Sequence, residues 1–475
     1  MTNVISKDAV PSLDYLKSAW RAPSYDSRIT DTTYDFHYPV SGTRNTTCLR
    51  WVIPRSSGNK VPNVEKMVLA LDLKCVNSAK TGRPPIGIES APTNNVIASI
   101  FGTLTISYNT TVVCKIDNYG IYNYTRLMLN CDDNDFKTWA TPRCFYKEGE
   151  DEDLDDTMTE GWKKRRNCFG GPVISPKTIK QTDESGTEKD VDNPDLGKFE
   201  YSDKSNFFIG TLDHFLETPP ILSDCDIHVQ LDLAKPAYAF HSKDNTAGET
   251  DIAFDIEKAR LFIPSIQLND QLYTQLKTLL DKEPMRQFYT STSISTHSIS
   301  TGDKSTVFTS ICQGQYPNHV LVLLQETDRF LGKFSLNSLK FSRAFNADDD
   351  PFILQSASMK LNTKEIDALS CDEAVHSFKD EYFRLMNLTN QDNGKNCCSI
   401  TYKDFVEHNC FLLYDFTASM NLTEPPLQPL SQKGNLRLQL NFDKATTCPL
   451  TLIVICEFSS SLTIEDSGKV TVTTL

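Results

Sequence analysis

The sequence has no apolar run of about 20 residues, the length that a transmembrane helix needs. It also begins without a secretory signal, because MTNVISKDAVPSLDYLKSAW has no basic region followed by an apolar core. We therefore expect synthesis in the cytosol or nucleus and no secretion. Cysteine is plentiful, with 14 residues, but no CxxC pair occurs. In a reducing compartment this distribution predicts free thiols in or near the core, and neither a disulfide framework nor a zinc site.

An excess of basic residues is also absent. The formal net charge is −14 at pH 7, and the isoelectric point is about 5.1. Since phosphate backbones attract basic proteins, this balance disfavours direct, sequence-specific binding of nucleic acid. With 39% hydrophobic and 10% aromatic residues, the chain has the composition of a folded protein. Its 475 residues suggest two to four domains at roughly 100–200 residues each.

The common catalytic motifs are missing too. The sequence contains no GxGxxG, GxxxxGK[ST], HExxH or GxSxG segment, and no His-x-His pair supports the metal centre of a cupin-type enzyme. His228 falls on the polar face of an alternating strand and is expected at a surface or interface. The acidic run at residues 348–350 is interpreted as a solvated turn before Pro351 in preference to a cation site. We expect no enzymatic activity, and no catalytic, cofactor-binding or metal-binding residue among the isolated histidines His37, His214, His228, His241, His297, His319, His376 and His408.

What the sequence does contain is a series of alternating strands. Residues 436–442 follow the two-residue period of a half-buried strand, whose apolar face consists of Leu436, Leu438, Leu440 and Phe442. Residues 450–458 are apolar on both faces, which predicts a deeper strand covered on both sides. Helical patterns are few, the strongest being residues 269–284 and 372–388. The chain is therefore expected to be mainly β, with helices in the loops.

A long irregular segment covers residues 147–195. It begins with the acidic run EGEDEDLDD, passes through the basic WKKRRN, and continues without periodicity. Runs of charge are typical of solvated loops, so we expect an elaborated surface insertion. The KKRR cluster has the composition of a short nuclear-localisation or phosphate-binding element, but the neighbouring acidic residues weaken that interpretation.

Three short matches in the same order indicate an internal duplication. TISYNTTVV is echoed by SMKLNTKEI, with Asn109 and Asn362 in register, and YNYTRLM is echoed by DEYFRLM. Each half then has a Pro-Pro pair followed by an alternating strand, at residues 227–233 and 436–442. The first copy is longer between the second and third matches, and the irregular insertion accounts for the difference. We therefore expect two copies of one β domain.

An eight-stranded jelly roll is the architecture expected for each copy, because it manages the edges of large antiparallel sheets. The fold class is thus predicted as all-β, with two tandem eight-stranded antiparallel jelly-roll sandwiches and a few loop helices. The expected division is an N-terminal arm at residues 1–35, a first jelly roll at 36–243 with the insertion at 147–195, and a second jelly roll at 244–475.

Several segments resemble one known family. KGNLRLQLNFDKATTCPLTLIVICEFSSSLTIEDSGKV looks like that family's C-terminal Gly-Asn-Leu-Arg strand followed by a strand ending in Glu-Phe, and NNVIASIFGTLTISYN resembles its early Phe-containing strand and Asn turn. GWKKRR resembles a Gly-x-x-x-Arg-Arg element, and PSLDYLKSAWRAPSYDSRI looks like the N-terminal segment. The family is the double jelly-roll major capsid proteins of Polinton or Maverick elements and adintoviruses, related to those of virophages and large eukaryotic DNA viruses.

The resemblance implies a structural role in a virion. Such a protein forms a homotrimer whose six jelly rolls make a pseudo-hexagonal capsomer, and neighbouring capsomers tile an icosahedral shell around double-stranded DNA. The implied partners are further copies of the chain, a single jelly-roll penton protein at the vertices, and minor capsid proteins. By the same resemblance the N-terminal arm docks on a neighbour, the insertion faces outward or covers a neighbouring subunit, and the nucleus is an alternative place of assembly.

Two other functions stay open on the sequence alone. A tandem jelly-roll protein that binds glycans for attachment requires exposed aromatic clusters on its loops and, in some cases, calcium. A jelly-roll enzyme requires a bound metal. If the strand at residues 436–442 closes the second jelly roll, a charge at Leu438 or Leu440 is expected to prevent capsomer formation.

Overall fold

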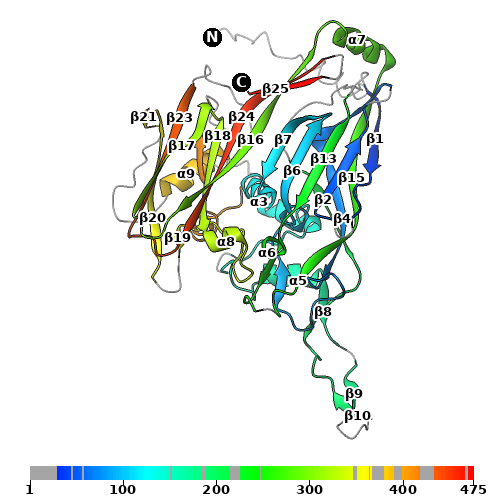
Figure 1. The fold of residues 1–475 in the computed structure, drawn as a ribbon, viewed down its shortest axis with the longest axis vertical. Helices are drawn as coiled ribbons and strands as arrows, with labels where there is room; N and C mark the ends of the chain where they lie inside the picture. Colours follow the sequence, from blue (N-terminus) through cyan, green and yellow to red (C-terminus); the bar gives the residue numbers. More distant parts are fainter. Residues whose placement is uncertain are drawn as a thin grey trace, which may run out of the picture.

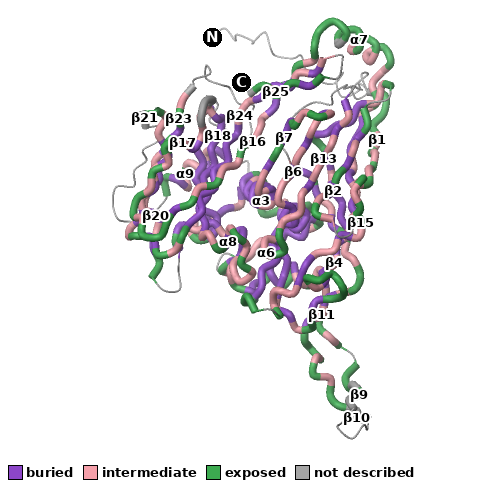
Figure 2. Tube along the Cα trace, viewed as in Figure 1, coloured by how far each residue is buried: buried purple, intermediate pink, exposed green. Residues whose placement is uncertain are grey.

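The computed structural model describes residues 29–43, 46–55, 58–149, 152–174, 176–182, 188–213, 225–246, 248–345, 350–362, 364–365, 379–389, 398–417, 433–465 and 469–474. Two β-sandwiches stand side by side, with a thin hairpin extending from one end of the first (Figure 1). Buried residues lie between the sheets of each sandwich, while the hairpin and helix α7 are exposed (Figure 2). Within these ranges, no helix is both long enough and apolar enough to span a membrane.

The first sandwich contains two antiparallel sheets. One follows the order β1-β15-β4-β12, with β3 beside β15, and the other follows β2-β13-β6-β7. The strands are β1 (Ile29–His37), β2 (Cys48–Ile53), β3 (Lys60–Pro62), β4 (Val68–Val76), β6 (Phe101–Tyr108), β7 (Thr111–Asp117), β12 (Asn206–Thr211), β13 (Ile227–Leu233) and β15 (Ala253–Leu268).

The second sandwich repeats this plan. Its sheets follow the orders β16-β24-β18-β22, with β25 beside β24, and β17-β23-β20-β19, with β21 beside β20. The strands are β16 (Met285–Ile299), β17 (Ser305–Gln315), β18 (His319–Glu326), β19 (Ala344–Phe345), β20 (Phe352–Leu361), β21 (Lys364–Glu365), β22 (Leu412–Asp415), β23 (Lys433–Phe442), β24 (Leu450–Ile464) and β25 (Val470–Thr474).

Eight strands take corresponding places in the two sandwiches. In chain order β1, β2, β4, β6, β7, β12, β13 and β15 match β16, β17, β18, β20, β21, β22, β23 and β24. This connectivity is that of a jelly roll, so the predicted fold class is confirmed. The two alternating strands of the expected duplication, β13 and β23, occupy the same place in their sheets. The Pro-Pro pairs before them lie outside the described residues.

The duplicated asparagine turns are equivalent in detail. Asn109 and Asn362 have φ angles of 52° and 53°, a left-handed conformation that asparagine tolerates better than most residues. The Asn109 side chain accepts a hydrogen bond from the Asp226 backbone N–H at 2.9 Å, and the Asn362 side chain accepts one from the Asn435 N–H at 3.0 Å. In both halves, therefore, one turn fixes the beginning of the strand that crosses the centre of the same sheet.

The division between the halves differs from the expected one. β15 pairs with β1 and β4, so residues beyond the predicted boundary at 243 and 244 belong to the first sandwich. β1 itself begins inside the segment 1–35 that we expected to be an arm, of which residues 1–28 lie outside the described residues. Alternation predicts a strand but not its partner, which is why the sequence placed β15 in the wrong half.

The strands follow the predicted patterns. Leu436, Leu438, Leu440 and Phe442 of β23 are each at most 2% exposed. The first eight residues of β24 are all buried, which confirms the deeper strand predicted there. Helix α7 (Asp270–Leu280) lies between the sandwiches in the chain, and its Asn269 cap accepts a hydrogen bond from the Gln271 N–H at 2.9 Å. The predicted helix with that cap is thus confirmed.

Further helices and short strands occupy the connections. α3 (Tyr119–Asn130) and α9 (Lys379–Leu388) follow corresponding strands, and the predicted helix at residues 372–388 is described from Lys379 onward. The remaining elements are η1 (Val64–Lys66), β5 (Ser90–Pro92), α2 (Val96–Ser99), α4 (Asp133–Lys137), η2 (Thr141–Arg143), α5 (Glu160–Asn167), β8 (Gly170–Pro172), β9 (Thr178–Thr182), β10 (Glu188–Asp192), β11 (Phe199–Tyr201), α6 (Pro236–Ala239), β14 (Phe240–Ser242), α8 (Thr327–Leu331) and α10 (Tyr402–Glu407).

Candidate assembly surfaces

Strand edges form one part of the junction between the sandwiches. β7, which ends the path of its sheet, contacts β16 and β25 of the second sandwich. The Tyr289 hydroxyl donates a hydrogen bond to the Val113 carbonyl at 3.0 Å, and the Thr111 hydroxyl donates one to the Val470 carbonyl at 3.2 Å. Because an open strand edge invites pairing with other chains, the second sandwich protects this edge by covering it.

Helix α3 lies between the two sandwiches and contributes a charge to the junction (Figure 1). An Arg126 guanidinium nitrogen is 3.6 Å from Glu457, and Glu457 is 3.2 Å from Nδ1 of His319. Nε2 of His319 is 3.4 Å from Asp415. Burial alone would raise the pKa of Glu457, but the hydrogen bond with His319 and the charge of Arg126 hold that pKa below its usual value. The first sandwich thus helps to stabilise a buried polar cluster on the second.

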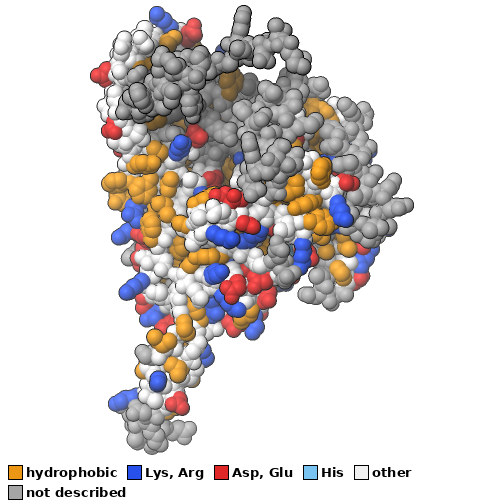
Figure 3. All heavy atoms as spheres, turned by 180° about the vertical axis from the view of Figure 1, so that it is seen from behind, with side chains coloured by type: hydrophobic (Ala, Val, Ile, Leu, Met, Phe, Trp, Pro, Cys, Tyr) orange, Lys and Arg blue, Asp and Glu red, His pale blue; other side chains and the backbone are white. Residues whose placement is uncertain are grey.

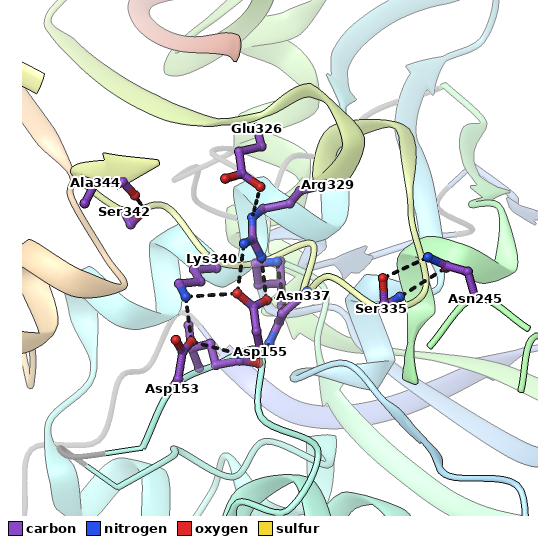
Figure 4. Close-up of polar contacts among 12 residues, drawn as sticks. Asp153, Asp155, Asn245, Glu326, Arg329, Ser335, Asn337, Lys340, Ser342 and Ala344 are labelled. Atoms are coloured by element: carbon purple, nitrogen blue, oxygen red, sulfur yellow. Dashed lines mark hydrogen bonds and ion pairs between the residues drawn. The ribbon is translucent and has the colours of Figure 1, made fainter. Parts of the chain in front are cut away.

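A second ionic contact joins the insertion of the first sandwich to the loop after α8 (Figure 4). Both terminal nitrogens of Arg329 bind the Asp155 carboxylate, one of them at 2.8 Å. The Lys340 amine lies 2.9 Å from the same carboxylate, and the Asn337 backbone N–H donates to it at 3.0 Å. These groups outweigh the effect of burial and hold the pKa of Asp155 well below its ordinary value. Glu326 contacts Arg329 from the other side at 3.2 Å.

Backbone contacts continue this junction beside α6. The Ser242 N–H donates to the Phe334 carbonyl at 2.7 Å, and the Tyr238 hydroxyl donates to the Phe330 carbonyl. Between them Gly332 has a φ of +80°, and a Cβ atom at this position would lie 3.1 Å from the Cβ of Ala237. Both the backbone conformation and the close approach therefore favour glycine here.

The basic part of the insertion is held inside the first sandwich. Arg165 of α5 is 1% exposed, and its guanidinium lies 2.6 Å from Glu148, whose side chain is 5% exposed. Arg165 also donates to the Pro92 carbonyl at 2.8 Å and to the Asn94 side chain at 3.1 Å. The Arg166 guanidinium stacks over the ring of Phe199 at 4.0 Å. The two arginines of KKRR thus hold neighbouring loops together.

The expectation that this charged segment is a solvated loop is therefore wrong for three charged residues in its first part. Glu148, Asp155 and Arg165 are paired with partners that lie far away in the sequence or on the opposite side of the insertion. Local composition resembles that of a solvated loop because the neutralising partners are not neighbours in the chain. Ion pairs between residues so far apart in the chain produce no periodic pattern in the sequence.

The rest of the insertion does project from the molecule. β9 and β10 pair in a hairpin that extends from the end of the first sandwich beyond β8 and β11 (Figure 1). Ile174, just before this hairpin, is 79% exposed. The hairpin and α7 lie at opposite ends of the molecule, so the long loops reach both ends of the strands.

The residues singled out from the sequence are scattered. His241 is 1% exposed, and burial lowers its pKa to about 4. His228 is half-buried on β13, and His319 belongs to the cluster with Glu457. Asp350 pairs with Lys444, whereas His214, His376, Asp348 and Asp349 lie outside the described residues. Among the residues that the structure describes, no three His, Cys, Asp or Glu side chains are grouped to hold a metal ion.

Eight of the twelve described cysteines are buried, and no disulfide joins two described residues. The predicted position of the thiols in or near the core is confirmed for this part of the chain. Sequence reasoning missed the two buried ionic contacts at the junction. The only signal for the contact of Asp155 with Arg329 was the presence of charged residues inside an otherwise irregular segment.

Comparisons with known proteins show which solved structures share this fold. No protein-family model and no curated protein matches the sequence. A chain in the cryo-EM structure of the Sputnik virophage matches with a TM-score of 0.59 at 10% identity, covering 96% of this chain and 90% of that one. The Faustovirus major capsid protein matches with a TM-score of 0.55 at 9% identity, covering 97% and 95%. The mavirus major capsid protein matches with a TM-score of 0.51 at 12% identity, covering 100% and 96%.

Each of these similarities spans both sandwiches and the junction between them. At such low identities the likeness is one of fold. The whole chain therefore has the double jelly-roll fold of these structures, in agreement with the strand order of its sheets.

Proposed function

We propose that this chain is a viral major capsid protein that builds an icosahedral shell around a double-stranded DNA genome. The observation that carries the proposal is the duplication itself: two jelly rolls of one topology are fixed side by side by hydrogen bonds and ion pairs along their junction. A unit of this kind suits repeated side-by-side packing in a protein shell. The likeness to proteins named as major capsid proteins over nearly the full chain supports it.

The proposed assembly is a homotrimer. Three chains bring six jelly rolls together, and a pseudo-hexagonal capsomer of this kind tiles a closed shell with its neighbours. A single jelly-roll penton protein at the vertices and minor capsid proteins are the further partners that we propose. The site of the protein is then the virion, after synthesis in the host cell and assembly in the cytoplasm or nucleus.

The β9–β10 hairpin suits an outward-facing or neighbour-covering role. It projects along the direction of the strands and carries charged residues such as Lys180 and Asp192. In a shell whose strands stand perpendicular to its surface, a hairpin in this position reaches beyond the wall. Deleting residues 176–192 is expected to leave the trimer intact and to change the interaction with a partner outside the wall.

The experiment that tests the proposal is the assembly state of the purified full chain. Light scattering is expected to give about three times the chain mass of 53.5 kDa, and electron microscopy is expected to show particles with a pseudo-hexagonal outline. A chain that stays monomeric at every protein concentration and ionic strength tested would contradict the capsid role.

The alternative of a glycan-binding attachment protein is not favoured. That function requires aromatic clusters on loops, whereas two of the most exposed aromatic residues, Tyr34 at 68% and Phe36 at 58%, lie within strand β1. A glycan array probed with the assembled protein distinguishes the two functions, because a capsid wall requires no glycan binding.

A further inference from the structure

Helix α3 contacts the second sandwich at one defined position along its paired strands. One row of paired residues crosses the outer face of the sheet β16-β24-β18-β22. Arg126 of α3 reaches Glu457 in this row at 3.6 Å. The row consists of Thr292, Glu457, His319 and Asp415.

The same row exists in the first sandwich. Its position follows from a backbone hydrogen bond that occurs in both sandwiches. The Leu212 N–H donates to the Met67 carbonyl at 2.9 Å in the first, and the Phe416 N–H donates to the Asn318 carbonyl at 2.8 Å in the second. The residue after Met67 therefore corresponds to the residue after Asn318. Following the pairing from there, the equivalent row consists of Phe36, Phe262, Val68 and Thr211.

Three of the four residues in this row are apolar, whereas all four in the other row are polar. Phe36 is 58% exposed, and its neighbours on the same face of the chain, Tyr34 and Tyr38, are 68% and 62% exposed. Hydrophobic side chains gather at the edge of the molecule where β1 lies (Figure 3). The inward residue Asp35 is instead paired with Lys60 at 2.6 Å, so β1 turns its polar face to the protein and its aromatic face to the outside. A contiguous exposed apolar patch of this kind marks an interaction surface.

The helix that would cover this row is also duplicated. Arg126 of α3 corresponds to Arg384 of α9 by the matching Arg-Leu-Met segments, so Thr125 corresponds to Phe383. Thr125 is fully buried, whereas Phe383 is 64% exposed. Leu385 of α9 is fully buried in its own sandwich, so Phe383 is held on the outer side of the helix.

We propose that α9 of one chain docks on the outer face of β1, β15 and β4 of the next chain, as α3 docks on the second sandwich within the chain. Phe383 then packs against Phe36 and Phe262 of the neighbour. The inference rests on the proposed function, because it uses the pseudo-sixfold arrangement of jelly rolls in a trimer. The contact is head-to-tail, and repeated with a rotation of about 120° it closes three copies into a ring. The contact within the chain is polar, and the contact between chains is apolar.

A photocrosslinker tests this contact in the full-length protein. Phe383 is replaced by p-benzoylphenylalanine, which preserves an aromatic side chain, and Phe288, which is 65% exposed on β16, is replaced in a matched control. Irradiation of the Phe383 derivative is expected to give covalent dimers and trimers, with cross-linked peptides from residues 29–43 or 253–268 of another chain. The Phe288 derivative is expected to give no cross-link to those peptides.

Charge substitutions provide the second readout. Phe36→Lys and Phe383→Lys are each expected to weaken trimer formation at least 10-fold while the thermal midpoint of the monomer, compared at a concentration too low for trimers, stays unchanged. Phe36→Lys combined with Phe383→Glu is expected to restore the trimer. Ile174→Lys, on the hairpin side of the insertion, is the control. If the wild type is trimeric but the Phe383 derivative cross-links only to other segments, the interface is overturned and the capsid role stands. A monomeric wild type overturns both.

Discussion

The Asp155 carboxylate and the Arg329 guanidinium meet across the junction between the two jelly rolls, with a distance of 2.8 Å in one of their two hydrogen bonds. One partner comes from the insertion of the first jelly roll and the other from the helix after a central strand of the second. Lys340 reaches the same carboxylate at 2.9 Å, so the single acidic group faces two cations. The insertion is therefore a structural connection between the halves as well as a loop.

Asp155→Asn is expected to destabilise the chain because it leaves Arg329 and Lys340 without their shared anion. Breaking a buried ion pair costs roughly 3–5 kcal/mol, and a value of about 2 kcal/mol is expected here because Glu326 and the partial exposure of Asp155 offset part of the loss. Urea unfolding at pH 7 measures the difference. Asp156→Asn is the matched control, since Asp156 is exposed and asparagine preserves its hydrogen bond with the Met158 N–H. Equal effects of both changes would refute the role of the junction pair.

Stability is expected to fall between pH 6.5 and pH 4 through His241. Burial lowers the pKa of His241 to about 4, so the folded chain keeps this imidazole neutral where the unfolded chain takes up a proton. The unfolded state then binds more protons, and the free energy of unfolding decreases by roughly 1.4 kcal/mol per pH unit in this window. Chemical denaturation from pH 8 to pH 4 measures the slope. His241→Gln is expected to reduce it by about one proton, and an unchanged slope would contradict the assignment.

Gly332→Ala is expected to cost about 1–3 kcal/mol, because the residue must keep a φ of +80° and its new methyl group would lie 3.1 Å from the Cβ of Ala237. Gly302→Ala separates the two causes. Gly302 has a φ of +97° and has no atom within 4 Å of a Cβ position. Thermal or urea unfolding measures the loss of stability in each variant. A larger loss for Gly332→Ala than for Gly302→Ala reports the close packing between the jelly rolls, and equal losses would show that the packing there is loose.

Leu438→Asp is expected to prevent folding of the second jelly roll. Leu438 is fully buried, and an unpaired carboxylate in such a site costs several kcal/mol, which approaches the whole stability of a domain. Soluble expression and size-exclusion chromatography measure the outcome. Arg437→Asp places the same charge on the exposed side of the same strand and is expected to yield soluble trimers. If Leu438→Asp also yielded soluble trimers, the inward orientation of this face would be wrong.

Much of the fold follows from local patterns. The alternation in β23, the doubly apolar β24 and the Asn269 cap are properties of a few consecutive residues, and the structure confirms each of them. The duplication was visible because Asn109 and Asn362 both need the left-handed conformation, which restricts the residue type.

The features that the sequence did not reveal depend on residues far apart in the chain. Ile29 pairs with Leu268, and Asp155 pairs with Arg329, so neither the membership of β15 in the first sheet nor the ion pair of Asp155 has a local signal. The aromatic face of β1 was missed for a related reason. Its alternation alone does not say which face is turned outward, and only the pairing of Asp35 with Lys60 decides it.

The long reach of the Asp155 contact also sets an order of events during protein synthesis. Its partner Arg329 lies 174 residues later, so at roughly 5–20 residues per second a ribosome needs on the order of 10–35 s to produce it. During that interval the acidic segment lacks Arg329 and Lys340, and during its first part β1 also lacks its pairing partner β15. A chaperone that binds unfolded chains is therefore expected to protect the first half of the nascent chain most during this interval. Slower translation would lengthen the interval.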